Sequence, residues 1–143
     1  MSKAFTSEDA GTPPEPPRRR GVPIPVGTPN YITDAGARAL RSELDGLSPD
    51  DHDRVRELSE HLATAVIMLP PPDRGRVAFG ATVTVIDEDG ESATYRIVGA
   101  IESSPRDGAI YWQSPIALAL HDAVVGDFVG LPRGDVEVIA IEY

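Results

Sequence analysis

The sequence predicts an α+β protein in which a short antiparallel helical hairpin is followed by an antiparallel sheet with one helix. Two patterns support this prediction. Between residues 33 and 69 apolar side chains recur at three- and four-residue steps, the spacing of amphipathic helices. From Arg76 onward they alternate with polar side chains, the spacing of strands. Half of the fourteen prolines lie in residues 1–30, so we expect this segment to be a disordered, proline-rich tail.

Charge and composition narrow the classes of function. The 143 residues carry a net charge of −10 and include no cysteine, which excludes disulfides, thiolate zinc sites and cysteine nucleophiles. Residues 1–30 contribute +1, partly from the run Arg18–Arg20, so the rest of the chain carries −11. A body this acidic repels phosphate backbones, so we expect direct nucleic-acid binding to be weak or absent. It is better suited to a basic protein surface.

The first predicted helix begins after Thr33, a favourable N-cap residue, and has Asp34 in its first turn, where a negative charge suits the helix dipole. It ends near Gly46 and Pro49 after roughly 14 residues, or about 21 Å. Its apolar stripe comprises Ala37, Leu40, Leu44 and Leu47.

A second helix is predicted to start within Pro49–Asp53 and to run to Leu69, where Pro70–Pro72 stop it. Its stripe comprises Val55, Leu58, Leu62, Ala65 and Leu69. Two amphipathic helices joined by a short loop fold back on each other, so residues 31–72 should form a hairpin.

Residues 76–143 should form the sheet domain. Asp87–Gly90 has the composition of a tight turn between two strands. Ser114 is a favourable N-cap and Pro115 a favourable first helical residue, so a helix should begin there. The predicted strands are Val77–Phe79, Thr82–Ile86, Ser92–Val98, Ala109–Trp112, Phe128–Leu131 and Val136–Tyr143.

Several of these segments together resemble the GreA/GreB family of bacterial transcription elongation factors. Residues 31–44 resemble the first helix of the family's coiled coil through Tyr31-Ile32-Thr33, Gly36, Leu40, Glu43 and Leu44. Five further segments resemble the family's C-terminal domain: Phe79–Val85, Tyr95–Gly99, Ser114–Leu120, Val125–Asp127 and Val138–Tyr143. The matches occur in the family's order and spacing.

The resemblance implies a helical hairpin followed by an FKBP-like C-terminal domain, a description of fold that carries no prolyl isomerase activity. In the family this domain docks at the rim of the secondary channel of core RNA polymerase. Gln113, Ser114 and Pro115 lie where the family's domain contacts the polymerase. The hairpin enters the channel and presents acidic residues at its tip to the catalytic magnesium, which stimulates cleavage of backtracked RNA.

The hairpin departs from the family's pattern. It is much shorter than in members with cleavage activity, and the stretch from Leu47 to Asp51 lacks their Asp-x-x-Glu-Asn type of tip motif. A short arm on the same docking domain resembles the regulators of nucleoside diphosphate kinase, which share the fold and also bind polymerase.

Four aspartates, Asp45, Asp50, Asp51 and Asp53, cluster at the predicted tip of the hairpin. Carboxylates held together there could position a magnesium ion, since hard cations prefer oxygen ligands. Alternatively, the last three simply initiate the second helix, where negative charge is favourable. We expect no metal site, cofactor or catalytic residue belonging to the chain itself.

The leading hypothesis is therefore a cytoplasmic regulator of transcription elongation, not an enzyme, that binds RNA polymerase at the secondary channel without strong transcript-cleavage activity. Two alternatives stay open: a cleavage factor that uses the acidic tip, and an interaction module for another enzyme such as nucleoside diphosphate kinase. No segment resembles a membrane span.

Overall fold

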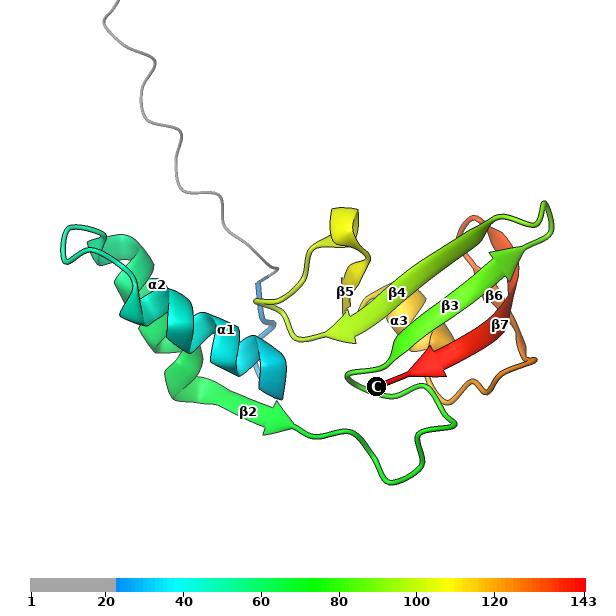
Figure 1. Cartoon of the computed structure of the whole chain (residues 1–143), viewed down its shortest axis with the longest axis horizontal. Helices are drawn as coiled ribbons and strands as arrows, with labels where there is room; N and C mark the ends of the chain where they lie inside the picture. The colour runs from blue at the N-terminus through cyan, green and yellow to red at the C-terminus, as the bar shows by residue number, and fades with distance from the viewer. Residues whose placement is uncertain (1–22) are drawn as a thin grey trace, which may run out of the picture.

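The structure, a computed structural model, describes residues 23–143. A pair of helices lies at one end of this part of the chain and a sheet lies at the other (Figure 1). Most of the predicted proline-rich tail falls in residues 1–22, outside the described residues; residues 23–29 lead into the first strand, which begins at Asn30. In the described part, none of the helices has the length and apolar character that crossing a membrane requires.

The two predicted helices are present, and with the strands that flank them they form a unit that we call the arm, residues 30–68. Helix α1 spans Asp34–Asp45 and helix α2 spans His52–Thr64. The predicted N-cap is confirmed, because the Thr33 hydroxyl accepts a hydrogen bond from the Gly36 N–H at 2.9 Å. Helices of 12 and 13 residues are about 18 and 20 Å long.

The prediction that the second helix continues to Leu69 is wrong. Helix α2 ends at Thr64, and Ala65–Met68 form strand β2, which pairs in parallel with β1, Asn30–Thr33. The Asn30 side chain donates hydrogen bonds to the His61 carbonyl and to the Thr64 hydroxyl, both at 3.0 Å, and so satisfies the end of the helix. β-Branched residues at positions 66 and 67 then favour the extended conformation.

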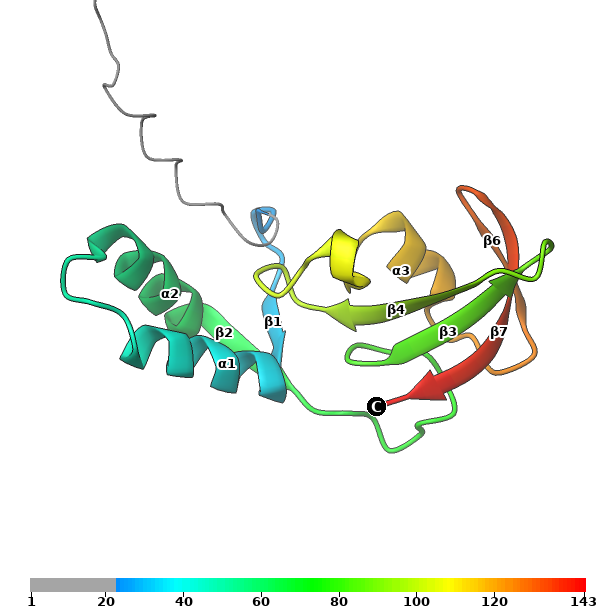
Figure 2. The same ribbon diagram turned by 45° about the horizontal axis from the view of Figure 1, so that its top comes forward.

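The prediction of an antiparallel sheet is wrong in one respect, because the sheet is mixed. Among the described residues its strand order is β5-β4-β3-β7-β6, and β5 runs parallel to β4. The loop after β4 contains the 3-10 helix η2, Pro105–Asp107 (yellow in Figure 2). This loop brings the chain back so that β5 starts beside Arg96, in the C-terminal half of β4 (Figure 1). The strands are β3 Thr82–Asp87, β4 Ser92–Val98, β5 Ala109–Tyr111, β6 Phe128–Leu131 and β7 Gly134–Glu142. The predicted strand segment Val77–Phe79 is not a strand.

The turn between β3 and β4 is confirmed in detail. The Asp87 carboxylate accepts hydrogen bonds from the N–H groups of Asp89 and Glu91, both at 2.9 Å. Gly90 has φ +82°, a conformation that glycine adopts at no steric cost. The acidic residues here therefore serve turn geometry.

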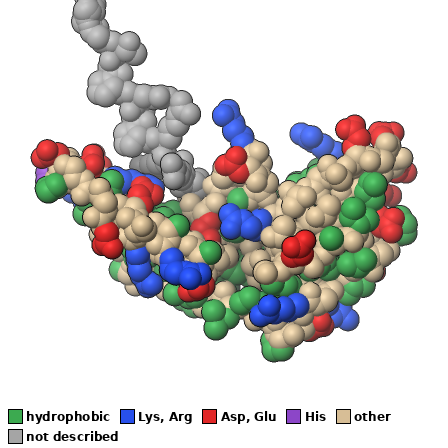
Figure 3. Space-filling view, viewed as in Figure 1, with side chains coloured by type: hydrophobic (Ala, Val, Ile, Leu, Met, Phe, Trp, Pro, Cys, Tyr) green, Lys and Arg blue, Asp and Glu red, His purple; other side chains and the backbone are tan. Residues whose placement is uncertain are grey.

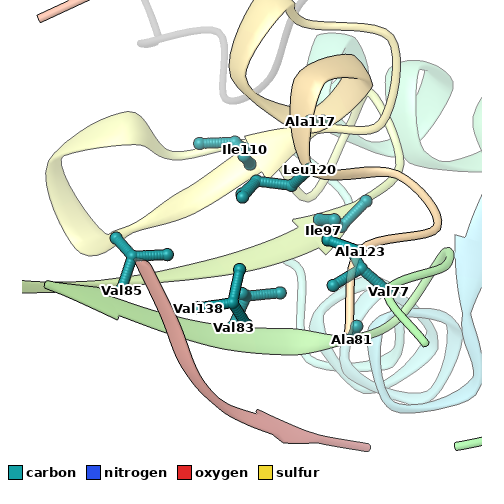
Figure 4. Close-up of a cluster of buried hydrophobic side chains, with 10 residues drawn as sticks. All are labelled: Val77, Ala81, Val83, Val85, Ile97, Ile110, Ala117, Leu120, Ala123 and Val138. Atoms are coloured by element: carbon teal, nitrogen blue, oxygen red, sulfur yellow. The ribbon is translucent and has the colours of Figure 1, made fainter. Parts of the chain in front are cut away.

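Helix α3, Pro115–Leu120, crosses one face of the sheet, and its start is as predicted: the Ser114 hydroxyl accepts a hydrogen bond from the Ala117 N–H at 3.3 Å. Ala117 and Leu120 face the sheet and close its core (Figure 4). The other buried side chains of this core are Val77, Ala81, Val83, Val85, Ile97, Ile110, Ala123 and Val138.

Candidate functional site

The turn between β5 and α3 carries the three predicted polymerase contacts. Gln113 and Pro115 are exposed, whereas Ser114 is half-buried. The Ser114 N–H donates to the Tyr111 carbonyl at 2.8 Å, and its hydroxyl caps α3. Gln113 and Pro115 are therefore free to meet a partner, while Ser114 holds the turn that presents them.

An apolar cavity of about 270 Å³ lies beside this turn, between the base of the arm and the sheet domain. Tyr31 from the arm contacts Trp112, with ring centroids 5.0 Å apart, and Phe79 in an edge-to-face arrangement at 6.0 Å. Trp112 is half-buried: it lines the cavity and also packs against the core of the sheet domain. The remaining lining residues are Met68, Leu69, Pro71, Ala78, Ile97, Ala117 and His121.

The four predicted tip aspartates lie together at the outer end of the arm, where Figure 3 shows acidic side chains. Asp45 ends α1, Asp53 lies in the first turn of α2, and all four side chains are exposed. Asp51 is the N-cap residue of α2, although its side chain makes no capping hydrogen bond. No group of three or more His, Asp or Glu side chains in residues 23–143 is arranged to hold a metal ion.

Sequence reasoning missed an ionic link that joins the two helices near this tip. The Arg54 guanidinium donates to both carboxylate oxygens of Glu43, at 2.6 and 3.0 Å, and to the Glu57 carboxylate at 2.9 Å. Its hydrogen bonds to Glu43 raise the pKa of Arg54 above its usual value, against the opposing effect of burial. The spacing of Glu43 and Arg54 around the predicted loop was the available signal, because paired hairpin helices bring such positions together.

The described residues thus form two candidate sites. One is the turn between β5 and α3 with the apolar cavity beside it, and the other is the exposed acidic tip of the arm. The family model "Transcription elongation factor, GreA/GreB, C-term" matches residues 71–143, which include the turn and the cavity wall on the sheet side.

Known relatives match over different lengths. Transcription elongation factor GreA of Nautilia profundicola is 47% identical over 85 residues, covering 57% of this chain and 52% of the relative. The chain therefore spans about half the length of this relative. Transcription elongation factor GreB of Neisseria meningitidis serogroup B is 32% identical and covers 81% of this chain and 95% of the relative.

A solved elongation factor GreA/GreB from Nitrosomonas europaea is 24% identical, covers 80% of this chain and 98% of its own, and superposes with a TM-score of 0.45. The family model spans just over half of the chain, and the GreB relative is aligned with most of it. The chain therefore belongs to the GreA/GreB family of transcription elongation factors.

Proposed function

We propose that the protein binds core RNA polymerase at the rim of the secondary channel through its C-terminal domain and regulates elongation by occupying that site. The arm then enters the channel without stimulating transcript cleavage. The observation that carries this proposal is the short arm, with helices of 12 and 13 residues, on a domain that matches the GreA/GreB family.

The length of the arm supports an occupying role over a catalytic one. Stimulated cleavage needs a carboxylate beside the catalytic magnesium, because two-metal chemistry works over about 4 Å. An arm of about 18 to 20 Å carries its tip only that far beyond the docking domain. The alignment with the Neisseria relative extends over 155 positions, more than the 143 residues of this chain, so that relative has residues this chain lacks.

The surface next to α3 supports docking there. Gln113 and Pro115 are exposed on a turn whose shape is set by the Ser114 cap, and the apolar cavity walled by Trp112 and Ala117 adjoins them. A partner side chain that filled this cavity would remove apolar surface from water, which is the dominant favourable contribution to most protein association. The FKBP-like description of this domain stays a prediction.

A second candidate function, a cleavage factor, is favoured by one observation. Asp45, Asp50, Asp51 and Asp53 are all exposed at the arm's outer end, where carboxylates would have to be to reach a metal held by the polymerase. The two functions differ in what the tip must do.

Cleavage of RNA in backtracked polymerase complexes separates them. We expect the wild-type protein not to accelerate cleavage and to inhibit partially the cleavage stimulated by an added full-length Gre factor. The variant Asp50→Asn/Asp51→Asn/Asp53→Asn should inhibit equally well, because inhibition comes from occupying the rim. Accelerated cleavage by the wild type that the triple variant loses would establish the cleavage factor instead.

The docking surface is tested with Gln113→Arg/Pro115→Glu, which keeps the Ser114 cap and places an acidic residue at the helix start, where it is tolerated. Binding to core polymerase and the inhibition should both weaken, while Glu88→Arg, on the distant β3–β4 turn, should bind as the wild type does. Undiminished binding by a folded double variant would remove this turn from the interface.

A further inference from the structure

Glu102 lies in the loop that follows β4, and its carboxylate joins the C-terminal domain to the arm. One oxygen accepts hydrogen bonds from the N–H groups of Gly99 and Thr33, both at 3.0 Å. The other accepts a hydrogen bond from the Thr33 hydroxyl, the group that also caps α1. The carboxylate thus receives one bond from its own loop and two from the residue at which the first arm helix begins, and hydrogen bonds to an ionised acceptor are the strong kind.

Two glycines show how closely the arm and the domain approach each other here. A Cβ atom at Gly36, in the first turn of α1, would overlap the Glu102 carboxylate. A Cβ atom at Gly99 would overlap the Tyr31 carbonyl oxygen. Glycine has a lower helix propensity than alanine. At Gly36 the absence of a side chain leaves the space that the Glu102 carboxylate occupies.

The side chain next to Glu102 crosses the same boundary. Ile101 is 4% exposed and belongs to the arm's core, where it packs with Ile32, Ala37, Leu40 and Leu58, although its position in the chain is within the sheet domain. Glu102 and Ile101 therefore fasten the base of the arm with one polar and one apolar contact. The covalent connection between the two parts is the segment that follows β2, which includes Pro70–Pro72.

We propose that Glu102 is a positioning residue: it fixes the direction of the arm relative to the C-terminal domain, and this direction determines whether the docked protein inhibits the polymerase. The second half of this inference rests on the proposed function. Turning an arm of about 18 Å by about 20° at its base would move its tip by about 6 Å, enough to displace it from the path it occupies. Docking itself uses the turn at Gln113 and Pro115 and does not require the arm to point in one direction.

The first half is tested without polymerase, using the full chain. The protein has no cysteine, so Ser42→Cys on the exposed side of α1 and Arg133→Cys in the β6–β7 turn give a unique pair of spin-label sites. Pulsed electron–electron double resonance should show a single narrow peak in the distance distribution between the two spin labels when the rest of the chain is wild type. Glu102→Gln keeps the side chain's shape but offers one oxygen acceptor, so that peak should broaden. Glu88→Gln makes the same chemical change on an exposed turn and should keep the narrow peak.

Gly36→Ala alters the same contact on the arm's side, and it provides a second test if Glu102→Gln does not fold. Alanine there should displace the carboxylate and broaden the peak, despite its higher helix propensity. In a Glu102→Ala background the added methyl group has room, so Gly36→Ala should cause no further broadening. That dependence of one substitution on the other identifies a direct contact between the two residues. A narrow peak for folded Glu102→Gln, or broadening by Gly36→Ala that is equal in both backgrounds, would overturn the proposal.

The second half is tested by measuring binding and inhibition separately. Glu102→Gln should bind core polymerase with the affinity of the wild type but lose most of the inhibition of Gre-stimulated cleavage. If its peak broadens and inhibition is unchanged, the arm's direction does not matter and this half is wrong. If the wild type neither binds nor inhibits polymerase, the proposed function fails, while the spin-label result still decides whether Glu102 sets the arm's direction.

Discussion

The C-terminal domain and the arm differ in whether each supplies all the side chains of its own hydrophobic core. The domain has a core in which α3 and four of its strands bury side chains from both sides, including Val83, Leu120 and Val138 at 0% exposure. In the arm, Leu58 reaches 0% and Ile32 1%, but Ile101, one of the side chains buried with them, comes from the domain's own sequence. The arm's core is therefore completed by a residue that the arm does not contain.

This difference has a physical cause. Short helices are marginal in water on their own, so most of their stability comes from burying an apolar face. Helices of 12 and 13 residues offer few positions for such a face, and the domain loop supplies what they lack. We infer that the domain can hold its fold while the arm opens, but that the arm depends on the domain.

The largest expected effect on stability comes from large-to-small substitutions in the two hydrophobic cores. Leu120→Ala and Leu58→Ala should each cost about 3 kcal/mol of stability, because each creates a cavity at a fully buried site. Leu120→Ala should destabilise the whole chain. Leu58→Ala should raise amide hydrogen exchange in residues 30–68 and in the loop after β4, while β3, β4 and β7 stay protected. Equal loss of protection in both regions would show one cooperative unit and would break the comparison.

A smaller effect is expected from the ionic link at the arm's outer half. Arg54→Met removes the bonds to Glu43 and Glu57 and keeps much of the stem's packing, so it should cost about 2 kcal/mol. Hydrogen exchange should increase at α1 and α2 and not in the sheet. Arg38→Met is the matched control: its ion pair with Asp34 is exposed, so its loss should cost less than about 0.5 kcal/mol. Equal costs for the two variants would contradict this account.

The smallest effect concerns the domain, where Tyr111 and Tyr143 differ in how their hydroxyls are satisfied. The Tyr111 hydroxyl is buried and finds no hydrogen-bond partner among residues 23–143, so Tyr111→Phe should raise the free energy of unfolding by up to about 1 kcal/mol. The Tyr143 hydroxyl donates to the Arg76 carbonyl, so Tyr143→Phe should lower it by about 1 kcal/mol. Denaturant unfolding at pH 7 measures both.

The advantage of Tyr111→Phe should also increase at alkaline pH. Burial raises the pKa of Tyr111 above its usual value of 10.0. A raised pKa in the folded state means that the wild type is at full stability below pH 10 and loses it as the pH rises through the folded-state pKa. The phenylalanine variant has no such loss at this position. A stability difference between variant and wild type that stayed constant from pH 7 to pH 11 would contradict the assigned burial.

Features set within a few residues could be predicted from the sequence. The helix starts at Thr33 and Ser114 and the turn at Asp87–Gly90 depend on hydrogen bonds between groups at most four residues apart, so residue type and spacing suffice. The candidate site was predictable to the same extent. The sequence predicts the helix start at Gln113, Ser114 and Pro115 and places the tip aspartates at the ends of two helices. It does not indicate the cavity beside the first site or the ionic link near the second.

Features that depend on distant residues were decided by the tertiary structure. Ala65 and Leu69 continue the apolar stripe of α2, yet Ala65–Met68 form a strand because β1 lies beside them and Asn30 ends the helix from more than thirty positions away. β5 runs parallel to β4 because of the path of the loop between them, which no local pattern records. Glu102 meets Thr33 across 69 positions, and nothing in either residue's neighbours indicates the contact. The spacing of residue types along the chain reports interactions between residues that are near each other in sequence. The contact between arm and domain joins residues far apart in sequence and forms only once both parts have folded.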